Sequence, residues 1–313
     1  MKRLTPFLLC CLALLFLLQA YSQEKKICIT VDDLPTVSYG IPGIEFQQDL
    51  TQALVQIFID NQIPAIGFVN ERKLYAEGIL DSNQVKLLTL WLESGLELGN
   101  HTYSHLNYHK VSFEQYTKDI LKGEAIIKEL GKAYDQEITY FRHPYLRSGL
   151  RQSHTDSLRV FLEENGYVES PVTIDNDDYL FAFAYSRAYK RGDQALMEKI
   201  GRDYVQYMEQ KLVYFEGQSQ KLFDRNMAHI LLIHANLLNS EYLDELVDVY
   251  KDRGYSFVSQ TEVLEDPAYA EPVTKFGDWG ISWLDRWALS RGYKGEFFQE
   301  DPPTPEYIKE LAK

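Results

Sequence analysis

The sequence predicts an α/β fold, a distorted (β/α)-type barrel built on about seven parallel strands. Short apolar runs rich in β-branched residues alternate along the chain with longer amphipathic stretches, which is the order of strands and crossover helices in a parallel sheet. The polar residues that stand out follow the predicted strands. Because all strands of a parallel barrel end on one face, these residues would meet there. An open doubly wound sheet is the alternative.

The predicted strands are short runs of mainly apolar, β-branched and aromatic residues, at 26–31, 64–69, 96–99, 138–141, 168–174, 230–233 and 256–258. The predicted helices carry apolar residues at helical spacing, at 46–61, 85–94, 113–130, 157–165, 194–215 and 240–253. We expect one domain over residues 23–265. Within it, 181–220 is long for one crossover and would form a helical insertion beside the site. Residues 266–313 would form a C-terminal extension packed on the barrel.

The first residues have the pattern of a secretory signal peptide. Lys2 and Arg3 precede an apolar run over 6–18 that is short for a membrane span, and small residues, Ala20 and Ser22, mark a cleavage site. Cleavage after Ser22 would give an exported chain, periplasmic or secreted, without a membrane span. An uncleaved anchor is the alternative.

The composition indicates a globular chain, with 45% hydrophobic and 25% charged residues. Removal of Lys2 and Arg3 with the signal would take the formal net charge from −14 to −16. A chain this acidic is not expected to bind nucleic acid. The mature chain would keep only Cys28, so it could form no internal disulfide and would depend on its core for stability.

The first predicted strand ends in two adjacent carboxylates, Asp32 and Asp33. Two acids at the end of a buried strand cost free energy unless a cation or a metal ion pairs with them. Adjacent residues of an extended chain point to opposite sides, so the two acids should have different roles. One could bind a metal ion, and the other could act as a general base on water activated by that ion.

Three further polar groups follow later strands. His101 and His105 lie four residues apart, and with one carboxylate they would form a metal set with open positions, typical of a catalytic centre. Arg142 could pair with the base, or belong to an ordinary surface turn. His234 could be a general acid for the leaving group, or a structural residue at the rim.

Four segments place this sequence beside a known family. Residues 30–35 (TVDDLP), 101–105 (HTYSH), 142–145 (RHPY) and 231–234 (LLIH) occur in the order found in polysaccharide deacetylases with a NodB-homology domain, carbohydrate esterase family 4. The chain resembles this family over residues 26–260. The resemblance implies a NodB-like barrel and a hydrolase that removes N-acetyl or O-acetyl groups from an acetylated carbohydrate.

The resemblance also implies a role for each site residue. Asp33, His101 and His105 would hold a divalent metal ion, often zinc, and Asp32 would be the base. His234 would be the acid.

In the same family pattern, Arg142 would orient the base, and the backbone N–H of Tyr145 would stabilise the oxyanion. Asp178 resembles the aspartate of the family's Asp-Trp segment, which helps to position the arginine and the acid histidine. Two positions depart from the family, with Leu34 where Gly is usual and Tyr179 where Trp is usual.

The remaining histidines are expected to have lesser roles, His109 and His143 at the rim of the site and His154 and His229 as structural residues. Trp279, Trp283 and Trp287 are spaced four apart and would share one stripe of a helix. The stripe would pack against the barrel or offer a platform for sugar rings.

Two other functions stay open. A carbohydrate-binding protein could use the same barrel after loss of the chemistry, with the tryptophan stripe binding glycan. A metal-dependent amidase could act on a small N-acyl compound, with 181–220 closing the groove as a lid. The sequence identifies neither the sugar, nor the linkage, nor any protein partner.

Overall fold

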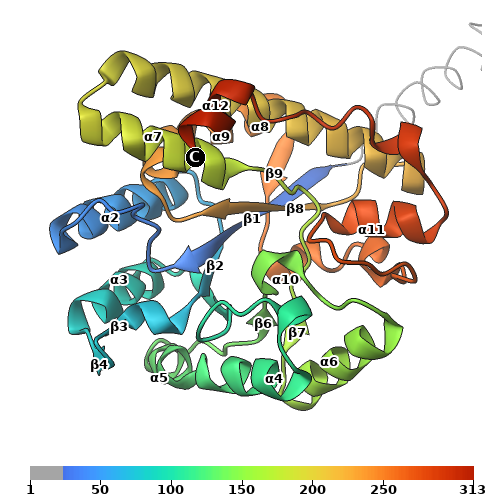
Figure 1. Cartoon of the computed structure of the whole chain (residues 1–313), viewed down its shortest axis with the longest axis horizontal. Helices are drawn as coiled ribbons and strands as arrows, with labels where there is room; N and C mark the ends of the chain where they lie inside the picture. The colour runs from blue at the N-terminus through green and yellow to red at the C-terminus, as the bar shows by residue number, and fades with distance from the viewer. Residues whose placement is uncertain (1–23) are drawn as a thin grey trace, which may run out of the picture.

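The computed structural model describes residues 24–313, and the predicted signal peptide at 1–22 lies outside them. Its centre is a curled sheet of seven strands, with every pairing parallel. Helices surround this sheet (Figure 1). The predicted fold class is therefore confirmed. Over the residues from 24 onward, no helix is long and apolar enough to cross a membrane.

The strands are β1 (Lys25–Leu34), β2 (Ile66–Val69), β5 (Glu97–Asn100), β6 (Tyr140–Phe141), β7 (Val168–Glu169), β8 (His229–His234) and β9 (Tyr255–Phe257). Their order in the sheet is β7-β6-β5-β2-β1-β8, and β9 pairs with the start of β1. Strands β3 (Tyr75–Ala76) and β4 (Ile79–Leu80) form a separate antiparallel hairpin.

Strand β1 lies in the middle of the sheet because its apolar run is buried on both faces. Ile27, Ile29 and Val31 are wholly buried, and burial of each such side chain contributes roughly 1.5–3 kcal/mol. The strand pairs with both β2 and β8, and the register places Asp32 opposite His234. The predicted acid and base therefore come from neighbouring strands at the same edge of the sheet.

The predicted strand 168–174 is wrong beyond its first two residues. Strand β7 ends at Glu169, and Pro171, which has no N–H to give to a ladder, follows two residues later. The chain then crosses to β8, where the N–H groups of Thr173 and Ile174 both donate to the carbonyl of Ile230. This crossing links the segment after the edge strand β7 to β8 and curls the sheet toward a barrel.

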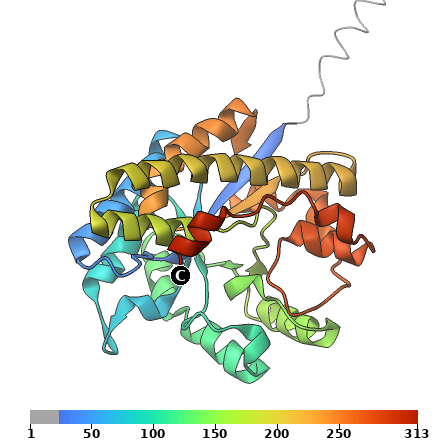
Figure 2. The ribbon, with the colours of Figure 1, turned by 45° about the horizontal axis from the view of Figure 1, so that its top comes forward.

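The helices are α2 (Ile44–Asp60), α3 (Ser82–Glu93), α4 (Phe113–Lys122), α5 (Ala125–Ala133), α6 (Gln152–Glu164), α7 (Asp178–Arg191), α8 (Gln194–Phe223), α9 (Leu237–Asp252), α10 (Gln260–Val263), α11 (Trp283–Ser290) and α12 (Glu306–Leu311). Five of the six predicted helices correspond to α2, α3, α6, α8 and α9. The stretch 181–220 forms most of α7 and α8, which lie side by side with α12 against α7 (Figure 2).

The predicted helix 113–130 is wrong as a single element, since it divides into α4 and α5 around Gly123. The buried carboxylate of Glu71 accepts hydrogen bonds from the N–H groups of Ile126 and Ile127, and so caps the start of a new helix. A long-range contact of this kind leaves no trace in helical periodicity.

The expected tryptophan stripe is also wrong, because Trp279 precedes α11. The hydroxyl of Ser282 accepts from the N–H of Leu284 and so starts the helix at Trp283. Trp283 and Trp287 are only 5% and 1% exposed, so neither can stack on a sugar. These two residues pack inside the protein, as the first alternative proposed.

Gly123→Ala is expected to destabilise the protein by about 1–3 kcal/mol. A Cβ at this position would lie 2.5 Å from backbone atoms of Thr102 and Tyr103, which cannot give way as a side chain can. Urea unfolding would measure the loss. Gly217→Ala is the matched control: no atom lies within 4 Å of its Cβ, and its stability should stay within about 1 kcal/mol. Equal stability of the two variants would contradict the packing described here.

Candidate metal centre and active site

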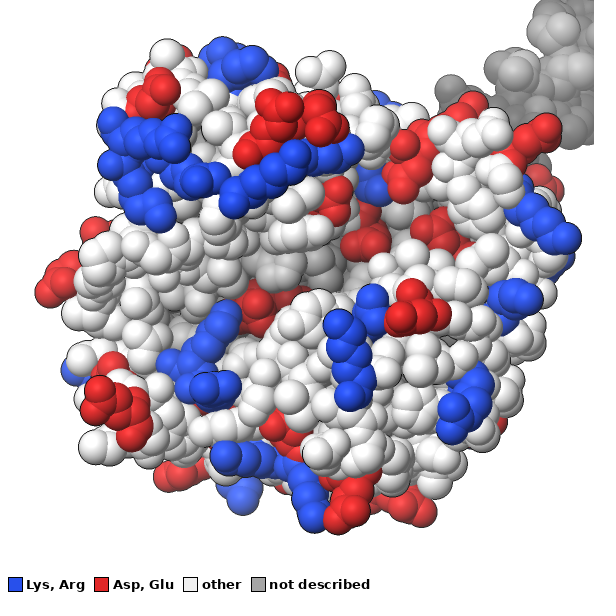
Figure 3. All heavy atoms as spheres, viewed as in Figure 1, with Lys and Arg blue, Asp and Glu red and all other residues white. Residues whose placement is uncertain are grey.

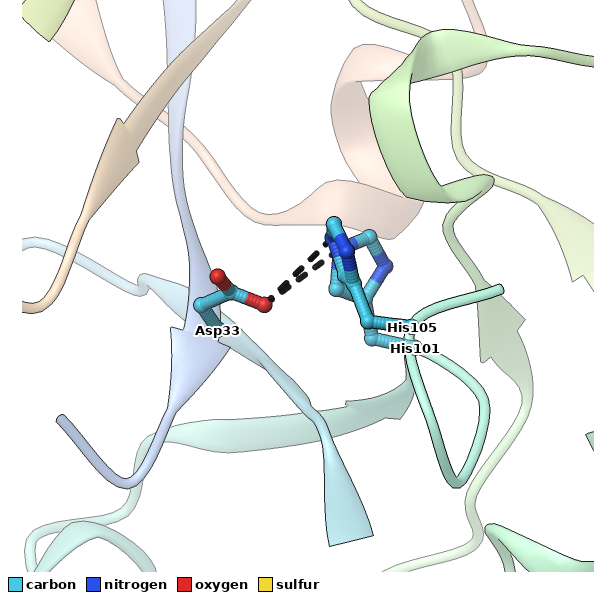
Figure 4. Close-up of side chains that lie close together, drawn as sticks. All are labelled: Asp33, His101 and His105. Carbon is cyan, nitrogen blue, oxygen red and sulfur yellow. Dashed lines mark ion pairs between the residues drawn. The ribbon is translucent and has the colours of Figure 1, made fainter. Parts of the chain in front are cut away.

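Asp33, His101 and His105 converge although they come from two separate segments. The Oδ1 atom of Asp33 lies 3.5 Å from Nε2 of His105 and 3.9 Å from Nε2 of His101. One potential ligand atom from each residue lies within 4.8 Å of the others. Figure 4 shows both rings beside the carboxylate. The structure thus brings the three predicted ligands together.

The local backbone explains how two histidines four apart reach one point. Thr102 and His105 have φ of 65° and 54°, in the left-handed region. The side chain of Asn100 accepts from the N–H of Thr102, and the Thr102 hydroxyl accepts from the N–H of His105. These two bonds hold a tight loop in which the rings of His101 and His105 contact each other, with centroids 4.9 Å apart.

These three residues fit a divalent cation. Among the described residues, Oδ1 of Asp33 is buried and has no hydrogen-bond partner. Nδ1 of His101 lies 2.8 Å from the carbonyl oxygen of Arg142 and must carry the proton, which leaves Nε2 free to bind a metal. Burial lowers the pKa of both histidines to about 4, so both are neutral near pH 7. One carboxylate and two imidazoles suit zinc.

Lys73 is a site residue that the sequence analysis missed. Its Nζ donates to the backbone carbonyl of Asp33 at 2.7 Å and lies 3.7 Å from the Oδ2 atom of the same residue. Burial favours the neutral acid at Asp33, but Lys73 and the two histidines outweigh it and lower the pKa well below its usual range. No local pattern around Lys73 signalled this contact.

The expected opposite orientation of Asp32 and Asp33 is wrong, because Asp33 has φ of 67° and the two carboxylates lie 3.8 Å and 3.9 Å from Nε2 of His101. Asp32 also contacts Arg142. Nη1 of Arg142 donates to Oδ1 of Asp32 at 3.3 Å. The guanidinium is wholly buried, and it also donates to the Thr30 hydroxyl and to both oxygens of Ser170. Burial raises the pKa of Asp32 above its usual value, and Arg142 acts in the opposite direction. A carboxylate with a raised pKa is a better proton acceptor.

His234 pairs with Asp178, the residue expected to position it. Nδ1 of His234 lies 2.7 Å from Oδ1 of Asp178, and the N–H of His234 donates to the other oxygen. Asn239 also donates to that second oxygen, at 3.0 Å. Burial alone would lower the pKa of His234, but the Asp178 carboxylate and the acids of β1 raise it to about 9. The imidazole is therefore protonated at neutral pH.

Tyr145 lies in a 3₁₀ turn, Pro144–Leu146, with φ of 58°. Its side chain is 55% exposed, and its ring packs edge-on against His105, with centroids 4.5 Å apart. The turn therefore borders the candidate metal site. The role of its backbone N–H stays a prediction.

The two departures from the family pattern differ in their exposure to solvent. Leu34 is 2% exposed and packs over Gly67, where a Cβ would lie 2.1 Å from the leucine Cδ1 atom. Leu34 thus belongs to the core. Tyr179 is 46% exposed and follows Asp178 in the first turn of α7.

The other histidines lie in well-packed surroundings. His143 pairs with Glu169 at 2.6 Å, and the His109 side chain is 1% exposed, 3.2 Å from Asp278. His154 stacks on Tyr108, and His229 is wholly buried beside Asn226 and Thr173. His109 and His143, which were expected at the rim of the site, therefore expose little of their side chains to solvent.

The face seen in Figure 3 is hollowed in the middle, and acidic side chains lie in the hollow. A separate cavity of about 800 Å³ lies between α6 and the segment 264–273. Its lining includes His143 and Glu169 but none of the predicted metal ligands, nor Asp32 or His234.

Comparisons with known proteins agree with these features. Residues 19–168 match the sequence profile of the family described as polysaccharide deacetylase. No curated protein matches the chain.

Three solved structures resemble this one in fold. A peptidoglycan N-acetylglucosamine deacetylase has 17% identity and a TM-score of 0.50, over 78% of this chain and 89% of that chain. The peptidoglycan deacetylase PdaC from Bacillus subtilis has 18% identity and a TM-score of 0.48, over 78% and 91%. A carbohydrate esterase family 4 pseudoenzyme from Bacillus anthracis has 16% identity and a TM-score of 0.47, over 78% and 66%. Residues 19–168, just under half of the chain, thus carry the sequence pattern of the polysaccharide deacetylase family.

Proposed function

We propose that this protein is an exported, metal-dependent deacetylase that hydrolyses N-acetyl, or O-acetyl, groups of a carbohydrate. One observation carries the proposal. Two groups suited to opposite functions border one candidate metal set: Asp32, which has a raised pKa and pairs with Arg142, and His234, which has a pKa of about 9 and pairs with Asp178. Nε2 of His101 lies 3.8 Å from Oδ2 of Asp32, so the base would border the metal.

Asp33, His101 and His105 would hold the ion, and zinc is the metal that their donor atoms suit best. When bound, the ion would polarise the acetyl carbonyl and acidify the attacking water.

The protein's own groups would move two protons. Asp32 would accept a proton from the water while the water oxygen bonds to the acetyl carbon, and Arg142 would hold the Asp32 carboxylate in place. His234 would give its proton to the sugar nitrogen, or oxygen, as the bond to the acetyl carbon breaks. The Tyr145 N–H would donate to the oxyanion. The products are acetate and a free amine or hydroxyl.

The substrate would be an acetylated glycan outside the cytoplasm. Lys2, Arg3 and the apolar run over 6–18 support export. Two of the similar structures are named peptidoglycan deacetylases, so peptidoglycan is the first glycan to test, followed by chitin fragments and acetylated xylan. One similar structure is named a pseudoenzyme. Here a base, an acid and three candidate ligands are all present, which favours activity.

The test is acetate release from these three glycans. We expect release by the wild-type protein, loss of release with a chelator and recovery with zinc. Asp32→Asn should lower kcat about 100-fold or more because it removes the base. Asp49→Asn, an exposed aspartate on α2, is the control and should keep full activity. A protein that binds zinc yet releases acetate from no glycan would contradict the polysaccharide substrate and direct the search to small N-acyl compounds.

Metal binding can be tested without any substrate. His105→Ala and Asp33→Ala should each weaken zinc binding by about 10-fold or more in isothermal titration calorimetry, since each removes one of three ligands. Asp32→Asn should bind zinc almost as the wild-type protein does. Equal affinity in all variants would show that these residues are not the ligands.

The pH dependence reports on His234. Its acid form is lost as the pH rises through about 9, so kcat/KM should fall on that alkaline side. In Asp178→Asn the carboxylate that raises this pKa is gone, and the alkaline limb should move down toward the ordinary value of 6.5. NMR titration of His234 measures the same pKa without activity. An unchanged pKa in Asp178→Asn would contradict the assignment, and Asp49→Asn again serves as the control.

A further inference from the structure

The C-terminal extension contacts the turn that carries Tyr145. We call residues 277–286, at the start of α11, the C-terminal clasp; Figure 1 shows α11 on the same side of the molecule as β7 and α6. At Gly280 in the clasp, a Cβ would lie 1.8 Å from the carbonyl oxygen of Tyr145. Only glycine permits this approach, so the clasp and the turn share one backbone contact.

Arg286 fixes the next residue of the turn. It is 1% exposed, and its Nη2 donates to the carbonyl oxygen of Leu146 at 2.6 Å. Its Nε donates to the carbonyl of Ile281, which returns the guanidinium to the clasp itself. Burying a charged arginine costs free energy, and an apolar side chain could fill the same space. Since Arg286 donates to two backbone carbonyls, its contribution is to hold the backbone in place.

Asp278 holds the far end of the same loop. It accepts a hydrogen bond from Arg147, and it lies 3.2 Å from Nδ1 of His109. Nε2 of His109 accepts from the N–H of Gly149, which places the ring proton on Nδ1, toward Asp278. The loop is thus tied to the clasp before and after Ser148.

The clasp also reaches the segment that leads to Asp178. The N–H of Trp283 donates to the carbonyl of Val172 at 2.7 Å, and the Ser282 hydroxyl donates to that of Thr173 at 2.8 Å. One short segment therefore bonds both to the turn that carries Tyr145 and to the segment that leads to Asp178.

The turn needs such support because its backbone is strained. Tyr145 and Leu146 have φ of 58° and 53°, two successive non-glycine residues in the left-handed region. This conformation persists only where the surrounding structure enforces it. The direction of the Tyr145 N–H follows from the conformation of this turn, so it depends on the same contacts.

We propose that the C-terminal clasp is a working part of the active site, in which Gly280 and Arg286 are positioning residues. They hold the Tyr145–Leu146 turn so that the Tyr145 N–H is aimed at the oxyanion. This inference rests on the proposed deacetylase function. It gives a segment outside residues 19–168, the part of the chain that matches the family, an indirect part in the reaction through the position of the Tyr145 N–H.

The first variant is Gly280→Ala, which forces the Tyr145 carbonyl to move. The second is Arg286→Lys, which keeps the positive charge but loses the planar guanidinium that donates to two carbonyls. Gly217→Ala, with open space around its Cβ, is the control. We expect kcat to fall about 10- to 100-fold in both variants, the range for a misplaced oxyanion donor, with KM and zinc affinity within about twofold. A merely structural role would move all three quantities together. If Arg286→Lys fails to fold, Gly280→Ala carries the test.

Hydrogen–deuterium exchange gives a readout without substrate. Residues 143–149 should exchange at least fivefold faster in both variants, with β1 and β8 unchanged. Wild-type kcat and wild-type exchange would overturn the proposal, as would a loss of kcat accompanied by equal losses of zinc affinity and of protection in β1. If the wild-type protein releases no acetate at all, the proposed function fails by itself. Exchange at 143–149 then still decides whether the clasp holds the turn.

Discussion

The site depends above all on one buried guanidinium. Arg142 is 0% exposed, and its side chain bonds to Thr30 and Asp32 on β1 and to Ser170 after β7. Its carbonyl oxygen lies 2.8 Å from Nδ1 of His101 and fixes that ring. Removal of one partner of such a buried pair costs roughly 3–5 kcal/mol because the other charge is left alone. The same residue therefore positions both Asp32, the predicted base, and one candidate metal ligand.

Two adjacent acids acquire different properties from their surroundings. Asp32 points toward the interior, where burial outweighs Arg142 and raises its pKa. Asp33 points toward Lys73 and the histidines, which outweigh burial and lower its pKa. A permanently ionised carboxylate suits a cation, and a carboxylate of raised pKa suits proton transfer. The difference does not come from regular alternation along the strand, since Asp33 has φ of 67° and both carboxylates approach Nε2 of His101. It comes from the different groups that surround each acid.

Much of the fold and of the candidate site could be predicted, because both follow from rules that act locally. The apolar runs predicted the strands. Because parallel strands end on one face, the sequence also predicted that Asp33, His101 and His234 meet at one edge of the sheet. Pro171 is a local signal that the predicted strand 168–174 ends early. The break at Gly123 and the contact of Lys73 could not be foreseen, since each depends on residues distant in sequence.

The contacts of the C-terminal clasp could not be predicted from the sequence either. The spacing of its tryptophans forms a local pattern, whereas no local pattern marks Arg286. The side chain of Arg286 holds the end of the turn that follows Arg142, because it donates to the carbonyl of Leu146. The side chain of Arg142 ties the residue before the turn to Ser170. Buried charges are weak sources of stability, so their value here lies in geometry. Arg286 donates to a carbonyl of the turn itself, and a carbonyl held in this way restrains the peptide plane beside it. A turn restrained in this way keeps a backbone N–H in one direction, which is what the predicted oxyanion donor would require.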